Sequence, residues 1–354
     1  MALHDQQFLN QVGQPRLAPR VFNLQRSGQA EHAMGEFRAW AGYKNLGSDV
    51  VTGGLAHLQH VLSFAGTDVA GRTGVHAHLA HAHIVIPTSG RGVFSYDGIA
   101  TPALPGMVIV QHGGTVHDQF EYSYAAASAA ENRATPLSVE PTPADAPPRS
   151  FGFIELFVPQ KFANVEIVPP AEVTPELERT AWDHPYHLPG ARFSLQAADA
   201  PGAAYRPLAG SPGLEIRDCA TWEPSAGLVA TWIIRPASDP PTVGPALAPV
   251  IEGEADGVDI LTVIAGSVAF ARPGGVGLLL HAGDTLTCSQ GWLGDIAACS
   301  PDMSLLRFFI AARAADLPRA TPEEIGRLEA LGPGIVTRSE IRPEGDTRPI
   351  NGLR

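Results

Sequence analysis

Apolar residues recur in short segments, and residues 55–64 alternate between apolar and polar, which is the period of a β-strand with one buried face. Strands are predicted over residues 55–64, 84–86, 106–110 and 151–158. Turn residues at 89–92 and 113–114 follow two of these strands. Thr followed by Pro, a helix-start signal, occurs at Thr174 and Thr321. The pattern predicts an all-β protein with short peripheral helices.

Composition agrees with this pattern and restricts the partners. The chain has 354 residues, of which 44% are hydrophobic, enough for two domains with two cores. The 37 Gly and 32 Pro favour short strands and turns. A formal net charge of -12 argues against nucleic acid or an anionic membrane as partner and favours a small-molecule substrate.

The cysteines and the N-terminal region predict a cytoplasmic protein. The three cysteines, Cys219, Cys288 and Cys299, have neither an even number nor a metal-binding spacing, so we expect free, buried thiols. Residues 1–20 are polar and lack the apolar core of a signal peptide, and no long apolar run predicts a membrane span.

Histidines gather in one part of the chain. Six of the thirteen lie between residues 71 and 120: His76, His78, His81, His83, His112 and His117. Imidazole is the commonest metal-binding side chain. In a strand, His76 and His78 would point to the same face because side chains alternate. These residues therefore predict a metal site.

The spacing of the histidines and glycines resembles the two motifs of the cupin family. The first motif is His76-x-His78-x4-His83-x6-Gly90, and the second is Gly106-x5-His112-x-Gly114-x2-His117. The resemblance implies a jelly-roll-like β-barrel whose metal ligands are His76, His78, His83 and His117. The chain departs from the family pattern at His83, where Glu is usual, and at His112, where Pro is usual. We expect His81 at the surface or behind a ligand, and His112 at the barrel rim.

The second half repeats these spacings without the histidines. Glu252, Glu254, Asp259 and Gly266 follow the first motif at one constant offset, and Gly283, Ser289, Gly291 and Gly294 follow the second. A fixed period over paired motifs indicates internal duplication. The chain is therefore expected to hold two tandem cupin barrels, a bicupin, whose second barrel has lost its metal.

Composition shifts set the expected boundaries. Residues 1–45 lack a strand period and form an N-terminal arm, and 125–148, rich in Ala and Pro, form an exposed insertion. The expected units are the arm, a first barrel (46–170), a linker (171–212), a degenerate second barrel (213–316) and a C-terminal helix and tail (317–354).

The donor set suggests the metal and the chemistry. Imidazole ligands suit one divalent transition metal, Fe(II) first, with Ni, Mn, Cu or Zn as alternatives. The segment Thr115-Val116-His117-Asp118 is similar to a segment of gentisate-type ring-cleaving dioxygenases, which are bicupins with a three-His iron site. The resemblance implies cleavage of a hydroxylated aromatic acid or hydroquinone, with Asp118 and Gln119 as candidate catalytic residues. Gln119 stands where that family usually has a second His.

Other functions stay open at this point. A metal-dependent isomerase, lyase or decarboxylase would use the same ion as a Lewis acid, and a non-catalytic ligand-binding bicupin would need no metal. Each carries the same fold. Because open sheet edges favour association, we also expect a homo-oligomer with residues 1–45 at the interface.

Overall fold

A computed structural model describes fourteen stretches of the chain: residues 22–34, 41–64, 76–78, 80–96, 99–113, 115, 117–123, 149–159, 164–166, 188–211, 213–237, 257–271, 277–289 and 295–317. These stretches are mainly β-strands, with short helical turns at α2 (Ser48–Val51), η1 (Ser27–Gln29) and η3 (Ala312–Asp316). The all-β prediction is confirmed. The insertion at 125–148 and the helices expected after Thr174 and Thr321 lie outside the described residues.

The first barrel consists of two facing sheets that share one long strand, β6 (Ala82–Tyr96). One sheet contains the first half of β6. On one side of β6 it continues through β10 (Arg149–Val158), β4 (His57–Phe64), β3 (Ala41–Asn45) and β2 (Ala33–Met34), and on the other through β8 (Val108–His112) and β12 (Ser194–Gln196). The other continues from the far half of β6 into β7 (Ile99–Ala103), β9 (His117–Ser123), β5 (His76–His78) and β11 (Asn164–Glu166).

The turn predicted at 89–92 is wrong, because β6 runs through it without a break. Gly90 lies in the left-handed region, with φ 65°. The pairing register with β10 shifts close to this point, between Gly152 and Phe153. A glycine without a Cβ tolerates this conformation, so the strand bends from one sheet into the other. The bend brings both histidine motifs to the interior of one barrel.

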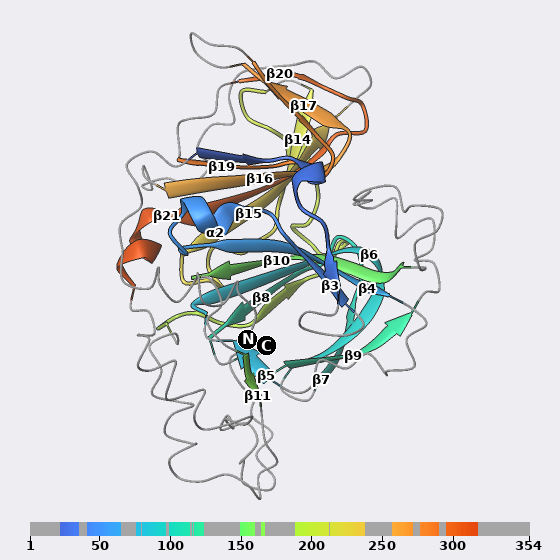
Figure 1. Cartoon of the computed structure of the whole chain (residues 1–354), viewed down its shortest axis with the longest axis vertical. Coiled ribbons are helices and arrows are strands. Elements are labelled where there is room, and N and C mark those ends of the chain that lie inside the picture. Colours follow the sequence, from blue (N-terminus) through green and yellow to red (C-terminus); the bar gives the residue numbers. More distant parts are fainter. Residues whose placement is uncertain are drawn as a thin grey trace, which may run out of the picture.

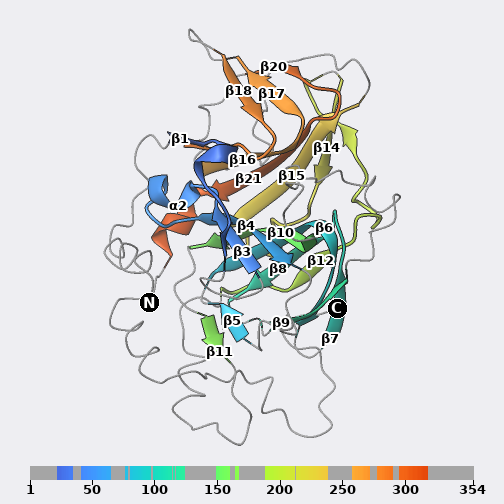
Figure 2. The same cartoon turned by 45° about the vertical axis from the view of Figure 1, so that its right-hand side comes forward.

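The second barrel is built in the same way (Figure 1). Its larger sheet holds β1 (Phe22–Gln25), β19 (Thr285–Ser289), β16 (Gly257–Ala265), β21 (Ser304–Ala311), β15 (Val229–Pro236), β14 (Leu214–Asp218) and β13 (Arg206–Pro207), in that order. Its smaller sheet holds β18 (Leu278–His281), β17 (Ser267–Phe270) and β20 (Ile296–Cys299). Figure 2 shows this smaller sheet at the end of the molecule remote from the first barrel.

Matching topology supports the internal duplication. The neighbours β6-β10-β4-β3 in the first barrel correspond to β16-β21-β15-β14 in the second. The motif glycines also match in conformation: Gly90 and Gly266 both have φ 65°, and Gly106 and Gly283 have φ 83° and 84°. The same bends therefore recur at the positions that the sequence spacing assigns to each other.

Strands from the expected arm and linker join the barrels. β1, whose residues alternate between apolar and polar, pairs with β19 of the second barrel, so the expectation of no strand period in residues 1–45 is wrong there. β12, from the expected linker, pairs with β8 of the first barrel. Pairing covers sheet edges that would otherwise present unpaired backbone groups. Part of the arm is thus used within the chain, and its role between two copies stays a prediction.

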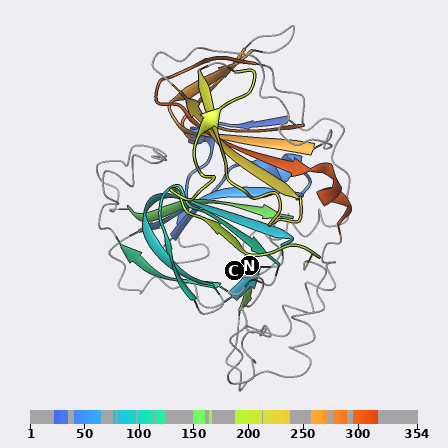
Figure 3. The same cartoon turned by 180° about the vertical axis from the view of Figure 1, so that it is seen from behind.

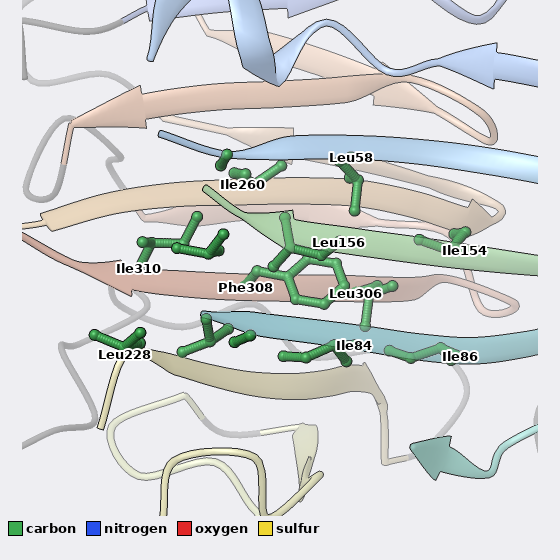
Figure 4. Packing of buried hydrophobic residues seen from close by; sticks show 14 of the residues in the cluster. Leu58, Ile84, Ile86, Ile154, Leu156, Leu228, Ile260, Leu306, Phe308 and Ile310 are labelled. Carbon is green, nitrogen blue, oxygen red and sulfur yellow. The ribbon is translucent and has the colours of Figure 1, made fainter. Parts of the chain in front are cut away.

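The largest hydrophobic core lies between the two barrels. The β10–β6–β4 sheet packs against the β21–β16–β15 sheet, and both views from the front and from behind show these layers stacked (Figures 1 and 3). Figure 4 shows Leu156 and Ile84 from one sheet beside Phe308 and Ile260 from the other. Burying each such side chain contributes about 1.5–3 kcal/mol, so this layer holds the barrels together. Two further clusters fill the barrel interiors.

Two sequence expectations concern the cysteines and membrane spans. The three cysteines are free, and Cys219 and Cys288 are buried whereas Cys299 is half-buried. Burial raises the pKa of the Cys219 thiol to about 12, so it stays protonated at neutral pH. Among the described residues, no helix has the length and apolar character needed to span a bilayer.

Candidate metal centre

Three histidines from three strands meet inside the first barrel. His78 lies on β5, His83 on β6 and His117 on β9, and all three are buried. One ligand atom of each lies within 4.8 Å of those of the other two. His76 pairs with His117 in the β5–β9 register, but its side chain lies outside the described residues. The structure therefore brings together three of the four predicted metal residues.

The donor atoms fit one metal ion. The His117 Nδ1–H donates to the carbonyl oxygen of Thr115 at 3.0 Å, which leaves the lone pair on Nε2. That atom lies 3.1 Å from His78 Nε2. Two nitrogens bound at right angles to one ion, each at about 2.1 Å, would lie about 3 Å apart. The pair is thus already spaced as adjacent ligands of a divalent transition metal.

Phe157, at the end of β10, holds two of the histidine rings in place. It stacks on His83 with ring centroids 4.1 Å apart and an interplanar angle of 10°. It also meets His78 edge-on, with centroids 5.0 Å apart. The β10–β6 register pairs Phe157 directly with His83, so the strand pairing itself sets this contact. The aromatic ring limits the rotation of both donors and excludes water from that side.

Glu155 is a site residue that the sequence interpretation missed. Its Oε2 accepts a hydrogen bond from His83 Nε2 at 3.0 Å, and its Oε1 accepts one from the Gln59 side chain. The Glu155 side chain is 9% exposed. A signal was available, because Glu155 is the single charged residue in the apolar stretch 151–158. A buried carboxylate in such a strand needs a partner, and the partner is a predicted metal ligand.

Tyr96, at the end of β6, also faces this interior. Its ring centroid lies 6.1 Å from that of His117 and 4.7 Å from that of Phe193, and it belongs to the first barrel's apolar cluster. Burial raises the pKa of the Tyr96 hydroxyl well above its usual value, and the Glu155 carboxylate raises it further. The hydroxyl is therefore neutral and able to donate a hydrogen bond.

The remaining predicted residues lie elsewhere or outside the described part. Asp118 and Gln119 belong to β9, but their side chains are outside the described residues, so their catalytic role stays a prediction. His112 is buried, and its Nδ1–H donates to the Gly113 carbonyl at 2.8 Å, while its place at the barrel rim stays a prediction. His81 is buried as well, so the expectation of a surface position is wrong and a place behind a ligand stays open.

The second barrel holds an ion pair at the matching position. Asp259 corresponds to His83, because each pairs with a Phe of the neighbouring strand. Arg307 corresponds in the same register to Glu155 and donates from Nε to Asp259 at 2.8 Å. Both side chains are 3% exposed. In the second barrel the Arg307 guanidinium therefore provides a positive charge next to Asp259. Glu252 and Glu254 lie outside the described residues.

Comparison with known proteins shows the fold and nothing finer. No protein-family model and no curated protein matches the chain. An 11S globulin from Wrightia tinctoria, whose structure reveals an auxin binding site, superimposes with a TM-score of 0.51 at 9% identity over 85% of each chain.

Two other solved structures are less similar. A glyoxylate-induced protein from Pseudomonas aeruginosa has a TM-score of 0.49 at 9% identity, over 88% of this chain and 95% of its own. Bacterial pirin YhhW from Escherichia coli, in complex with nickel(II), has a TM-score of 0.45 at 12% identity, over 82% of this chain and 99% of its own. The globulin and the shared two-barrel topology support the bicupin fold predicted from the motifs. None of the three names is that of a ring-cleaving dioxygenase.

Proposed function

We propose that the first barrel binds one divalent transition metal, most simply Fe(II), and that the protein is a dioxygenase acting on a small hydroxylated aromatic compound. The observation that carries the proposal is the buried cluster of His78, His83 and His117, whose ligand atoms lie within 4.8 Å of one another. A lone buried histidine is commonly structural, but three converging donors from separate strands match the ligands of a facial metal site.

In this proposal the chain's own groups hold and orient the ion. His78, His83 and His117 would be its ligands, with His117 oriented by the Thr115 carbonyl and His83 by the Glu155 carboxylate. A bound Fe(II) would supply the reactivity toward dioxygen that side chains lack. Three neutral ligands leave coordination positions for a bidentate substrate and for dioxygen.

The surroundings of the cluster favour an aromatic substrate. Phe94, Phe151, Phe153 and Tyr96 pack together in the first barrel's apolar cluster, beside the histidines. Phe193, just before β12, is buried in the same cluster and contacts Tyr96. Aromatic walls bind flat rings by offset or edge-on contact, and they keep water away from a reactive centre.

A second candidate draws on Glu155. A carboxylate beside a metal ligand can take or give a proton, which a metal-dependent isomerase, lyase or decarboxylase needs. Such an enzyme would turn over without oxygen. The dioxygenase is preferred because it also accounts for the resemblance around His117.

One experiment tests the proposal in two stages. Metal content is first measured on protein purified without a His tag, for wild type, His78→Ala and His281→Ala. His281 is an exposed histidine of the second barrel, so its replacement should keep the metal, whereas His78→Ala should lose it. Oxygen uptake is then followed with dihydroxybenzoates and hydroquinones. Equal metal content in all three proteins would refute the metal site, and product formation without oxygen would favour the second candidate.

A further inference from the structure

Two polar side chains inside the first barrel have hydrogen-bonding groups that the described residues do not satisfy. The Tyr96 hydroxyl and both polar atoms of the Gln111 carboxamide are buried without a hydrogen-bond partner among them. Tyr96 is 0% exposed and Gln111 is 2% exposed. Leaving a buried polar group unsatisfied costs about 1–3 kcal/mol. Native proteins hold few such groups, and each calls for an explanation such as a functional role, strain, or a bound ion or water.

Both side chains face the metal centre. Gln111 is the cross-strand neighbour of His83 in the β6–β8 register, and it shares the inner face of β8 with Ile109. Tyr96 is the cross-strand neighbour of His117 in the β6–β9 register. Opposite residues in a strand pair lie with Cβ atoms about 4.5–5.5 Å apart on the same side of the sheet. Each group therefore sits beside one of the histidines.

The second barrel shows that the fold does not require a carboxamide at the Gln111 position. Gln111 corresponds to Cys288, since Gln111 pairs with His83 and Cys288 pairs with Asp259. Cys288 is a buried member of the second barrel's apolar cluster. The duplicated barrel thus packs a small apolar side chain where the first barrel places a carboxamide. Packing of the fold therefore does not account for the polarity at Gln111.

We propose that the Tyr96 hydroxyl and the Gln111 carboxamide bind the polar substituents of the substrate and orient it next to the metal centre. This inference rests on the proposed function. The hydroxyl donates one hydrogen bond, and the carboxamide donates two and accepts through its oxygen. A hydroxylated aromatic acid supplies matching partners, because its carboxylate accepts and its phenol both donates and accepts.

Charge favours an anion within that class. A divalent ion held by histidines would carry positive charge in a buried site. An anionic ring compound would offset part of that charge. A neutral hydroquinone would lack this electrostatic attraction. Dihydroxybenzoates are therefore expected to bind more tightly than hydroquinone.

The test measures binding without turnover. Wild type, Tyr96→Phe and Gln111→Leu are loaded with Zn(II), their metal content is measured, and gentisate and hydroquinone are titrated in by calorimetry. Each substitution should leave metal content unchanged and weaken gentisate binding about five- to tenfold, the effect of one lost hydrogen bond to a charged or polar partner. Matched controls in the second barrel are Tyr205→Phe and Thr287→Val. Thr287 carries a buried hydroxyl that also lacks a partner among the described residues, and both controls should bind gentisate as wild type does.

The outcomes separate this inference from the proposed function. Failure of wild type to hold metal would refute the proposed function. If metal-loaded wild type does not bind gentisate, the proposed substrate class is wrong. Unchanged gentisate affinity in both variants would overturn the role of Tyr96 and Gln111. Urea unfolding supplies a readout independent of ligand, because removing an unsatisfied group should not lower stability, and a clear loss in either variant would show a structural hydrogen bond instead.

Discussion

Replacing Glu155 by Gln should weaken metal binding in the first barrel while leaving the fold intact. The substitution keeps the shape of the side chain and an oxygen that can accept from His83, but it removes the negative charge. In the structure the carboxylate accepts from His83 Nε2 at 3.0 Å, and both side chains are nearly buried, at 9% and 4% exposure. Solvent therefore screens little of the interaction.

The magnitude follows from the kind of hydrogen bond. A bond to a charged group contributes about 1.5–3 kcal/mol and a neutral one about 0.5–1.5 kcal/mol, a difference of about 1–1.5 kcal/mol. This difference corresponds to about five- to tenfold in a dissociation constant. Partners that orient metal-bound histidines generally change affinity by about 10–100-fold when mutated. We therefore expect about a tenfold weaker metal complex.

The assay is competition for Zn(II) against a chromogenic chelator at fixed pH. Glu215→Gln is the matched control, because Glu215 pairs with Arg235 at 3.1 Å in the second barrel, away from the histidines. It should bind Zn(II) as wild type does. An unchanged dissociation constant for Glu155→Gln would refute the coupling between Glu155 and the metal. Tighter binding would show that the carboxylate competes with the metal for His83 Nε2.

Three further predictions concern other parts of the molecule. Asp259→Asn should lower the free energy of unfolding by about 3–5 kcal/mol, because it leaves Arg307 buried without its charge partner; urea titration measures this, and Asp259→Leu combined with Arg307→Met should recover the loss. His83→Ala should retain metal with weaker affinity while turnover changes, and unaltered metal affinity and turnover together would show that His83 is no ligand. Cys219 should resist iodoacetamide in the native protein at pH 8, since burial raises its pKa to about 12; fast alkylation detected by mass spectrometry would contradict its burial.

Short-range patterns predicted most of the fold. The strands predicted at 55–64, 84–86, 106–110 and 151–158 overlap β4, β6, β8 and β10, although β6 continues to Tyr96 through the predicted turn. The period of a strand can be recognised from neighbouring residues alone. The repeat was also visible in the sequence, and the matching φ angles of Gly90 and Gly266 agree with it. The pairing of β1 with the second barrel was not predicted, because Phe22–Gln25 alternates over only four residues and its partner β19 is far away in the chain.

Some residues of the candidate site could likewise be predicted from the sequence, and others only from the tertiary structure. The sequence by itself determined which histidines can be ligands, because His-x-His and the motif glycines act over a few residues of one strand or turn. Only the tertiary structure decided that Glu155, Tyr96 and Gln111 face those histidines, since β10 and β8 reach them through pairings between residues far apart in the chain. Burial then gives these groups their chemistry: a carboxylate, a phenol and a carboxamide that would be ordinary polar residues in water become costly to leave unpaired inside the barrel.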